Sequence, residues 1–368
     1  GNGIGSLLQL KCDCEHTREI NSLAKGELEQ FKTDYKQHHD FALLPTYSHI
    51  MNKKFNERCF HSLNNHVGEL IGNLMLIIEL PKIKNPDQCY WKNMIAYELI
   101  ETIEIRHNGL RLAYFDTDLL KIMKQQNISY TKQKGINQMI GYYNTVHGLK
   151  RNTNKIKYML PLPFLQHDET GQFFPIMART HVQEGFVIDM KIKKLNDLYN
   201  GENINLESNY ITSYIDSTYV KLTKQETHLF FSNILQYLFI DYDVNEYIFK
   251  STFKSGQMND QLTCHLHFKG LVKQFNIICF YENGQYEKLD SFKFYMNGKE
   301  FDKHDKPMNA NYYRYSTRNK NIPFDNIYTY SFSLLPNSHQ PTGTLNMDET
   351  NNCFFKLYKK DMDVTRIL

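Results

Sequence analysis

Two segments of the chain share one sixteen-residue pattern without a gap. Residues 97–112 and 286–301 keep the same tyrosine, glutamate, asparagine and glycine, and the two glycines, Gly109 and Gly298, lie 189 positions apart. In each segment the side chains alternate in character as they do along a β-strand, and an Asn-Gly dipeptide follows. This dipeptide readily adopts the positive φ angles of a type I′ hairpin turn. A hairpin repeated in this way predicts a chain built from two copies of one β unit.

Two weaker correspondences occur in the same order. Residues 68–81 correspond to 268–283, and each is a strand that leads to the repeated hairpin. Residues 160–178 correspond to 327–347, since each runs through a strand, a proline-broken loop, a glycine and a second strand. Three matching units in one order predict a duplicated all-β domain.

The length of the chain agrees with this division, because 368 residues exceed the usual size of one domain. The aromatic content of 14% also favours strands. A polar segment between the two copies is the expected boundary. We therefore expect an N-terminal arm over 1–27, a first domain over 28–195, a linker over 196–209 and a second domain over 210–368.

Charge and hydropathy exclude several classes of function. The 43 basic and 40 acidic residues are spread along the chain without the stripe of lysine and arginine that phosphate binding needs, so no direct nucleic-acid contact is expected. The longest apolar run, 74–78, is far shorter than a membrane span of roughly 20 residues, and we expect a chain that is neither secreted nor membrane-spanning. Seven scattered cysteines indicate reduced thiols in a cytosolic compartment.

Four segments carry specific motifs. These are FKTDYKQHHDFAL at 31–43, LPLPF at 160–164, NYITSYIDSTYV at 209–220 and SHQPTGT at 338–344. In the same order they resemble segments of the double jelly-roll major capsid proteins of nucleocytoplasmic large DNA viruses, whose members carry "EHQPSGT" near the end. In the first motif the positions that align with this family are Phe31, Lys32, Tyr35, His38, Phe41 and Ala42.

A helix is expected directly after the third motif. Thr223 and Glu226 have the spacing of a capping box, in which the hydroxyl and the carboxylate satisfy free backbone donors at a helix start. The resemblance implies a short helix at the same place, early in the second domain.

The resemblance implies both a fold and a role. The fold class is all-β, with two tandem eight-stranded jelly rolls joined by the linker. The role is that of a structural protein, a major capsid protein whose homotrimers are pseudo-hexagonal capsomers of an icosahedral shell. The implied partners are the chain itself, neighbouring capsomers, minor capsid proteins and an internal membrane. The implied location is the virion, with assembly in the host cytoplasm.

Two departures from the family occur near the end of the sequence. The segment after SHQPTGT reads LNMDETNN where members have an Asn-Phe-Ser-Arg run, and the sequence stops at Leu368. We therefore expect the last one or two strands of the second domain to be missing. Three explanations stay open: the sequence is truncated, those strands are supplied differently, or the chain is a divergent relative such as a minor shell component.

Three alternative functions stay open. Within the same fold, the chain could be a membrane-scaffolding protein or a minor capsid relative. From a different class, it could be a β-sandwich carbohydrate-binding module, which binds glycans through aromatic loops. Trp91 is the only tryptophan and lies beside a predicted strand, which weakens this last alternative.

Candidate chemical groups all have a structural interpretation. On a strand, His265 and His267 share one face while Cys264 points to the other, which is unsuited to one metal ion. The aspartate pairs, Asp116 with Asp118 and Asp241 with Asp243, lie at the ends of expected elements, where aspartate commonly caps or turns the chain. His38 and His39 belong to the first motif, and Cys12 and Cys14 are one residue apart, which is not the spacing of a zinc knuckle. Because no catalytic, nucleotide-binding or metal-binding motif occurs, we expect no enzyme, no catalytic residue, no cofactor and no metal.

Overall fold

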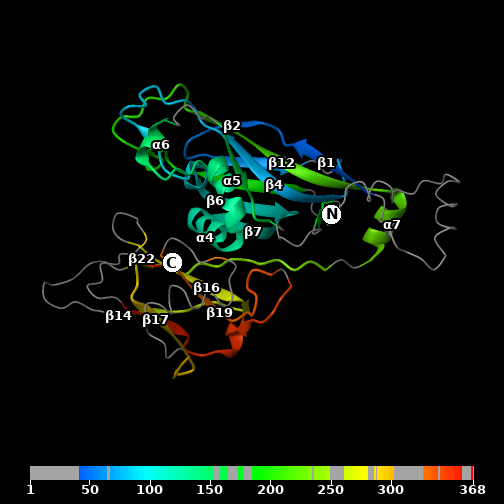
Figure 1. Ribbon diagram of the computed structural model, residues 1–368. Helices are drawn as coiled ribbons and strands as arrows, with labels where there is room; N and C mark the ends of the chain where they lie inside the picture. Colours follow the sequence, from blue (N-terminus) through cyan, green and yellow to red (C-terminus); the bar gives the residue numbers. More distant parts are fainter. Residues whose placement is uncertain are drawn as a thin grey trace, which may run out of the picture.

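The computed structural model describes most of the chain between residues 41 and 367. The described residues are 41–63, 67–151, 157–164, 173–176, 185–233, 236–248, 261–280, 286, 288–301, 321, 326–338, 340–358 and 366–367. Two bodies rich in strands lie one above the other in Figure 1, with helix α4 between them. The expected arm over 1–27 lies outside the described residues, as do Phe31, Lys32, Tyr35 and His38.

The first body contains two antiparallel sheets that face each other. One sheet has the order β1-β12-β4-β8, with β2 also paired to β12 and β9 to β4; the other has the order β3-β10-β6-β7. A small third sheet pairs β5 with β11. The strands are β1 (Phe41–Tyr47), β2 (Met51–Lys54), β3 (Arg58–Leu63), β4 (Leu70–Glu79), β5 (Tyr90–Trp91), β6 (Ile100–His107), β7 (Leu110–Asp116), β8 (Lys157–Pro161), β9 (Phe174–Pro175), β10 (Phe186–Ile192), β11 (Tyr199–Asn200) and β12 (Tyr210–Leu222).

The second body repeats the strand order of the first. One sheet has the order β13-β22-β16-β19 and the other β14-β21-β17-β18, with β15 and β20 forming an extra pair. In both bodies the last strand lies between two earlier ones. Strand β12 lies between β1 and β4, and β22 lies between β13 and β16. The strands are β13 (Tyr247–Ile248), β14 (Gln261–His265), β15 (Leu271–Val272), β16 (Gln274–Phe280), β17 (Ser291–Met296), β18 (Lys299–Glu300), β19 (Ile327–Ser331), β20 (Leu345–Asn346), β21 (Phe354–Tyr358) and β22 (Arg366–Ile367).

The two Asn-Gly hairpins occupy equivalent places. One joins β6 to β7 and the other joins β17 to β18, and each hairpin forms the far edge of its sheet. Asn108 and Gly109 have φ angles of 50° and 79°, and Asn297 and Gly298 have 52° and 75°. The turn geometry predicted from the sequence repeat is confirmed. The first of the two weaker correspondences also holds, because 68–81 contains β4 and 268–283 contains β16, which take equivalent places in their sheets.

Replacing Gly298 by alanine should isolate the strain of this turn. A Cβ at Gly298 meets no atom within 4 Å, so the left-handed backbone alone should cost about 1 kcal/mol of stability. Gly135 is the matched control, because it lies in helix α5 with open space around it and alanine there should stabilise the helix by up to about 1 kcal/mol. Chemical denaturation of both variants measures the difference, and equal effects would contradict the turn assignment.

Helices fill the connection between β7 and β8. Because residues 125–157 are polar and rich in asparagine and lysine, the sequence predicts a long surface loop there. The described helices of the first body are α3 (Ile95–Glu98), α4 (Thr117–Asn127), α5 (Tyr130–Ile140) and α6 (Val146–Arg151), with a 3₁₀ turn, η2 (Leu195–Asp197). The loop prediction was wrong because a short helix needs only a few apolar residues to be anchored to the core. Ile136 and Ile140, four positions apart, suffice to anchor α5 to the core.

The expected domain boundary is also corrected. The expected linker at 196–209 would begin the second domain at 210, yet β12 pairs with β1, β2 and β4 of the first body. Residues 205–207 are likewise bonded to 82–84 of the first body. Alternation identified 210–222 as a strand, but alternation carries no information about which sheet the strand joins. The chain passes between the bodies after Leu222 and before Tyr247.

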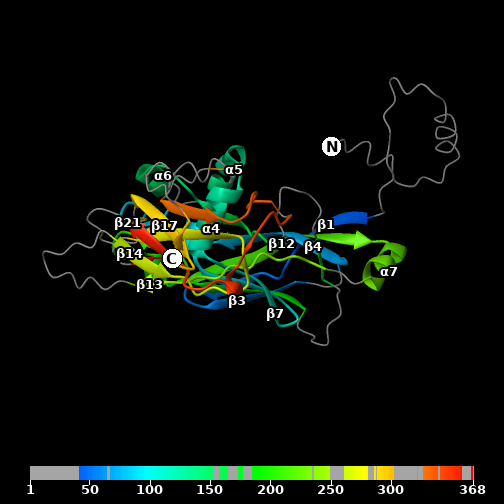
Figure 2. The same cartoon turned by 90° about the horizontal axis from the view of Figure 1, so that it is seen from below.

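Helix α7 (Lys224–Ser232) confirms the predicted capping residue. Thr223 Oγ1 accepts a hydrogen bond from the Glu226 amide at 3.2 Å, as an N-cap does. The helix belongs to the connection between the bodies and lies at the periphery of the molecule (Figure 2). Its position early in the second domain is therefore corrected together with the boundary.

Strand β22 lies at the end of the second body, where the departures from the family predict that strands are missing. Ile367 pairs with both Tyr247 of β13 and Cys279 of β16, so a strand lies between these two at this end of the sheet. A short 3₁₀ turn, η4 (Met347–Glu349), leads toward β21.

Each body has its own apolar core between its sheets. The first core includes Ile103 and Ile105 of β6, and the second includes the equivalent Phe292 and Phe294 of β17, all at most 1% exposed. Aliphatic side chains of the first copy are thus replaced by aromatic rings in the second. The two cores are separate clusters, so the two bodies are held together by other contacts than those of their cores.

Candidate functional site: the joint between the two bodies

Helix α4 is the element of the first body that touches the second. Asp116 begins the helix, because its carboxylate accepts a hydrogen bond from the Leu119 amide at 2.7 Å. The cap role suggested for Asp116 from its position is confirmed. On the side of the first body, Lys121 Nζ lies 2.5 Å from the Glu98 carboxylate, and Lys193 lies 3.6 Å from the same group. Burial would raise the pKa of Glu98, but the attraction of Lys121 outweighs it and the pKa lies below its usual value.

A buried polar network crosses from α4 to the second body. Gln126 Nε2 donates to Asn276 Oδ1 and to Thr329 Oγ1, both at 2.9 Å, and Gln126 Oε1 accepts from Gln274 Nε2 at 3.0 Å. Thr329 Oγ1 also donates to Asn276 Oδ1 at 3.0 Å. Gln126 is 3% exposed and Thr329 is 2% exposed, so water does not compete for these groups. We call Gln126, Gln274, Asn276 and Thr329 the joint network.

Apolar and capping contacts flank the joint network. Ile122 of α4 packs against Ile278, Phe280 and Ile327 of the second body in one buried cluster. The last carbonyls of α4, which have no partner within the helix, accept hydrogen bonds from side-chain amides of the second body, at Asn321 and Asn337. The helix end is therefore completed by the other body, which holds the two in one relative orientation.

The connection between the bodies also packs on the first one. Residues 236–246 belong to no helix or strand, and the rings of Tyr237 and Phe239 lie 5.9 and 6.0 Å from that of Phe174. Phe239 further stacks on Phe164 at 6.1 Å, and Tyr237 Oη donates to the Phe173 carbonyl at 3.0 Å. These contacts fix the path of the connection along the first body. We call residues 236–246 the strap.

Sequence reasoning missed the joint network. The three residues that Gln126 bonds across the joint lie 148 to 203 positions from it in the chain, and each member of the network reads as an ordinary surface residue. One signal was present: Gln126 follows Leu119, Ile122 and Met123 along the buried stripe of α4, and a polar residue on such a stripe requires a buried partner.

A neutral histidine lies inside the first body. His61 of β3 is 1% exposed, and its Nε2 lies 3.1 Å from Ser213 Oγ of β12 on the facing sheet. Burial lowers the pKa of His61 to about 4. Since an unfolded histidine has a pKa of about 6.5, its contribution to stability is complete above that pH and is lost as the pH falls toward 4.

The variant His61→Gln should reduce the acid sensitivity of the first body. Between pH 6.5 and 4 the native chain should lose on the order of 3 kcal/mol through this one side chain, whereas glutamine keeps a partner for Ser213 and does not titrate. Urea denaturation at pH 7 and pH 4 measures the loss. His265, exposed on β14, is the matched control for substitution by glutamine. An unchanged pH profile in His61→Gln would contradict the assignment.

The other candidate residues from the sequence are not brought together. Cys264 is buried while His265 and His267 are exposed, as the strand pattern predicted. Asp241 lies 3.2 Å from Arg111, and Asp243 accepts a hydrogen bond from the Val244 amide, so both stabilise the strap. Among the described residues, no three potential ligands are grouped for a metal ion. Cys12, Cys14, His38 and His39 lie outside the described residues.

Three further observations bear on the alternatives. Trp91 is 4% exposed and stacks on Phe55 at 6.3 Å, so its ring is not available to a sugar. The five cysteines in the described part of the chain are all buried. No helix in that part is both long enough and apolar enough to cross a bilayer.

Strand β1 exposes apolar side chains at the edge of the first body. Phe41, Leu43 and Tyr47 lie in one row of this strand and are 52%, 54% and 66% exposed. Among the described strands, only β12 pairs with β1. An apolar strand of this kind is a site at which another chain can pack or pair. We call Phe41, Leu43, Leu44 and Tyr47 the β1 surface.

The fold and the joint define a class of protein. Two β-sandwich bodies of equal strand order, held in one orientation by a buried joint and without a grouped set of chemical residues among those described, are typical of a protein that builds an assembly. The mostly β fold with few helices matches that of the viral double jelly-roll capsid proteins.

A match to a family profile identifies the particular family to which the chain belongs. The profile described as "Major capsid protein N-terminus" matches residues 29–241, more than half of the chain. The chain therefore belongs to the family of viral major capsid proteins, whose members are structural proteins and not enzymes.

Known relatives agree with this assignment. "Probable capsid protein 3" of Acanthamoeba polyphaga mimivirus is 23% identical over 233 residues, which are 56% of this chain and 10% of that protein. The chain thus spans about a tenth of the length of this curated relative. Among solved structures, the PBCV-1 virus capsid has a TM-score of 0.75 at 18% identity, covering 90% of this chain and 87% of the other. The Faustovirus major capsid protein has a TM-score of 0.66 at 10% identity, covering 95% and 92%.

Proposed function

We propose that the chain builds the shell of an icosahedral large DNA virus as a homotrimeric, pseudo-hexagonal capsomer made from two eight-stranded jelly rolls per chain. The observation that carries the proposal is the equal strand order of the two bodies, with the Asn-Gly hairpins at equivalent edges. Three chains around a three-fold axis would then present six similar bodies. Neighbouring capsomers, minor capsid proteins, an internal membrane and assembly in the host cytoplasm belong to the same proposal through the family resemblance.

The joint between the two bodies supports this role because a capsomer that packs in a lattice needs a fixed shape. A capsomer with six near-equivalent corners requires that the angle between the two bodies be the same in every chain. The joint network, the Ile122 cluster and the strap fix that angle by buried contacts at three separate places. A hinge between the bodies would instead give a range of outlines, which pack poorly in a lattice.

The β1 surface is the proposed contact between copies. Its exposed row of Phe41, Leu43 and Tyr47 would bury apolar area against a second copy, as the centre of an obligate interface does. The experiment compares Tyr47→Lys with Leu229→Lys, since Leu229 is also exposed at 58% but lies on α7. Light scattering of the unmodified chain should give three times the mass of one chain at micromolar concentration. Tyr47→Lys should weaken that association at least tenfold and Leu229→Lys should not.

Two outcomes would oppose this proposal. A monodisperse monomer of the unmodified chain would count against the trimer. Equal effects of the two lysine variants would leave the trimer in place but exclude the β1 surface as its contact.

A further inference from the structure

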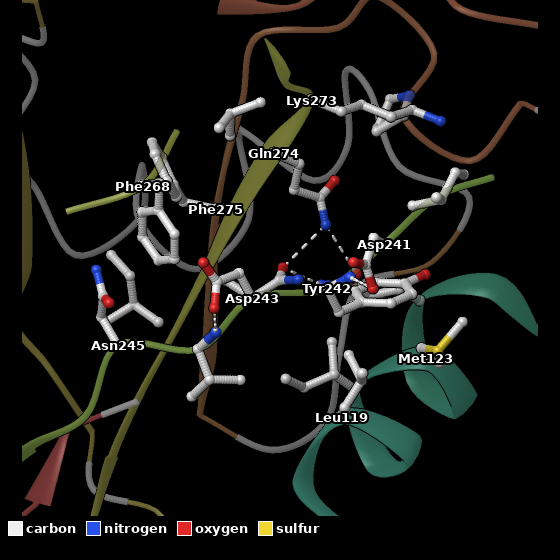
Figure 3. Close-up of a pocket in the computed structure, with 18 of the residues that line it drawn as sticks. Leu119, Met123, Asp241, Tyr242, Asp243, Asn245, Phe268, Lys273, Gln274 and Phe275 are labelled. Carbon is white, nitrogen blue, oxygen red and sulfur yellow. Dashed lines mark hydrogen bonds between the residues drawn. The ribbon is translucent and has the colours of Figure 1, made fainter. Parts of the chain in front are cut away.

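The outward face of β16 and β19 in the second body is covered by a helix of the first. Ile278 of β16 and Ile327 of β19 are paired across the two strands and pack against Ile122 of α4. The next outward pair on this face belongs to the joint network. Figure 3 shows Gln274 of β16 pointing toward the strap and α4. The contact within one chain is therefore a helix laid on the outside of a sheet.

Strands β4 and β8 of the first body correspond to β16 and β19. In each body the first of these two strands lies between the last strand of the body and the second. Residues 74–78 align with 275–279, since both segments turn their first, third and fifth side chains into a core. The register then gives the equivalent outward pairs: Ile77 with Met159 for Ile278 with Ile327, and Met75 with Pro161 for Asn276 with Thr329.

This outward face is open in the first body. Met159 is 36% exposed, whereas Ile327 at the equivalent position is 3% exposed beneath α4. Ile77 is 4% exposed, so Met159 is the accessible member of its pair. Figure 1 shows β4 and β12 on the side of the first body that is farther from the second, with α4 on the nearer side. The helix that covers the equivalent face thus lies away from this one.

The open face continues into the β1 surface. The register sets Tyr47, Asp216, Met75 and Pro161 in one row across β1, β12, β4 and β8. One side of this sheet therefore carries both groups of apolar side chains. We call Met75, Ile77, Met159 and Pro161 the β4–β8 face.

The polarity of the β4–β8 face excludes one occupant. Met75 and Pro161 stand where the second body has a polar pair that binds Gln126. A methionine and a proline side chain provide no donor and at most a weak acceptor. Gln126 of another copy would lose its hydrogen bonds on such a surface, which is unfavourable for a buried amide. Helix α4 of a neighbouring chain is therefore selected against at this face.

We propose that the β4–β8 face receives the second body of a neighbouring copy of this chain. The inference rests on the homotrimer of the proposed function. In a closed ring of three chains with two similar bodies each, the contact between chains repeats the contact within a chain. The second body would approach with the side that carries the connection from β18 to β19, because this connection follows the repeated hairpin as α4 does in the first body.

An apolar face suits a contact between separate chains. Within one chain the strap keeps the two bodies close, so their effective concentration is high and a polar network is sufficient. Association of separate chains must overcome the lost freedom of whole molecules. Burial of apolar surface offsets that loss, as it does in the centre of obligate interfaces.

Two lysine variants test the face by light scattering. Met159→Lys places a charge within the proposed contact. Phe60→Lys is the matched control, because Phe60 is 48% exposed on β3, in the other sheet of the same body. Met159→Lys should weaken the association of the chains at least tenfold, and Phe60→Lys should not. Hydrogen exchange in β6 and β10 should be the same in both variants, which verifies that the first body is folded.

Cross-linking identifies the occupant without a charged substitution. A photoreactive benzoylphenylalanine in place of Met159 is irradiated in trimers assembled from equal amounts of ¹⁵N-labelled and unlabelled chains. Cross-links that join a heavy to a light peptide and end within residues 261–358 support the second body of a neighbour. Cross-links to α4 or to other parts of a neighbouring first body, cross-links only within one chain, or none between chains would overturn it.

Failure of this face is distinguishable from failure of the trimer. A trimer that Met159→Lys leaves intact would retain the proposed assembly and exclude the β4–β8 face. Equal weakening by Met159→Lys and Phe60→Lys would exclude the face as well. A monomer of the unmodified chain at micromolar concentration would remove the trimer itself, and this contact with it.

Discussion

Truncation of Phe294 to alanine is expected to lower the free energy of unfolding of the second body by about 3 to 5 kcal/mol. The ring is 1% exposed at the centre of the second core. It contacts five other rings at centroid distances of 5.0 to 6.3 Å, those of Phe275, Phe301, Tyr330, Phe332 and Phe355. Removal of a side chain so enclosed leaves a cavity that the surrounding sheets cannot close.

The sequence repeat provides the matched control for this variant. Ile105 holds the equivalent position in the first body and is also fully buried, so Ile105→Ala should cost about 2 to 5 kcal/mol there. Hydrogen exchange measured strand by strand distinguishes the two effects. Phe294→Ala should raise exchange in β17 and β21, and Ile105→Ala in β6 and β10. If both variants loosened the same strands, the assignment of two separate cores would be wrong.

Replacement of Gln126 by leucine should separate the unfolding of the two bodies. The substitution leaves Asn276, Thr329 and Gln274 without a shared partner in a buried joint, which should cost about 2 to 4 kcal/mol. The cores are untouched, so the loss falls on the contact between the bodies. Calorimetry should then resolve two transitions, or a wider spacing between them, where the unmodified chain has the bodies coupled.

A double-mutant cycle isolates the joint from other effects of the leucine. If Gln126→Leu and Asn276→Leu act through one network, the cost of the pair should be less than the sum of the single costs by at least about 1 kcal/mol. Additivity to within about 0.5 kcal/mol would show that the two residues act independently.

Local patterns were sufficient to predict much of this fold. The Asn-Gly pairs predicted two hairpins, because the positive φ angles of such turns strongly favour these residues. Thr223 and Asp116 were recognised at the ends of elements for a similar reason, since a cap acts on amides two or three positions away. Predictions that depend on near neighbours in the chain were therefore reliable.

Pairings between distant segments could not be predicted in the same way. The alternation of 210–222 fits a strand in either body, and only the partners β1 and β4 decide that it closes the first. Gln126 looks like a surface residue of a polar helix until Asn276 and Thr329 are brought to it by the packing of the two bodies. The joint is thus a property of the tertiary structure, although the two bodies themselves are visible as a repeat.

The late position of β12 in the chain has a consequence for synthesis on the ribosome. Strand β4 ends at Glu79, but its neighbour β12 ends only at Leu222, so translation of 143 further residues precedes closure of that sheet. At about 5 to 20 residues per second this interval lasts roughly seven to thirty seconds. During that time the apolar edges of a nascent chain are open to other nascent chains. A chaperone that binds such edges would therefore be most useful after β4 has emerged from the exit tunnel and before β12 has.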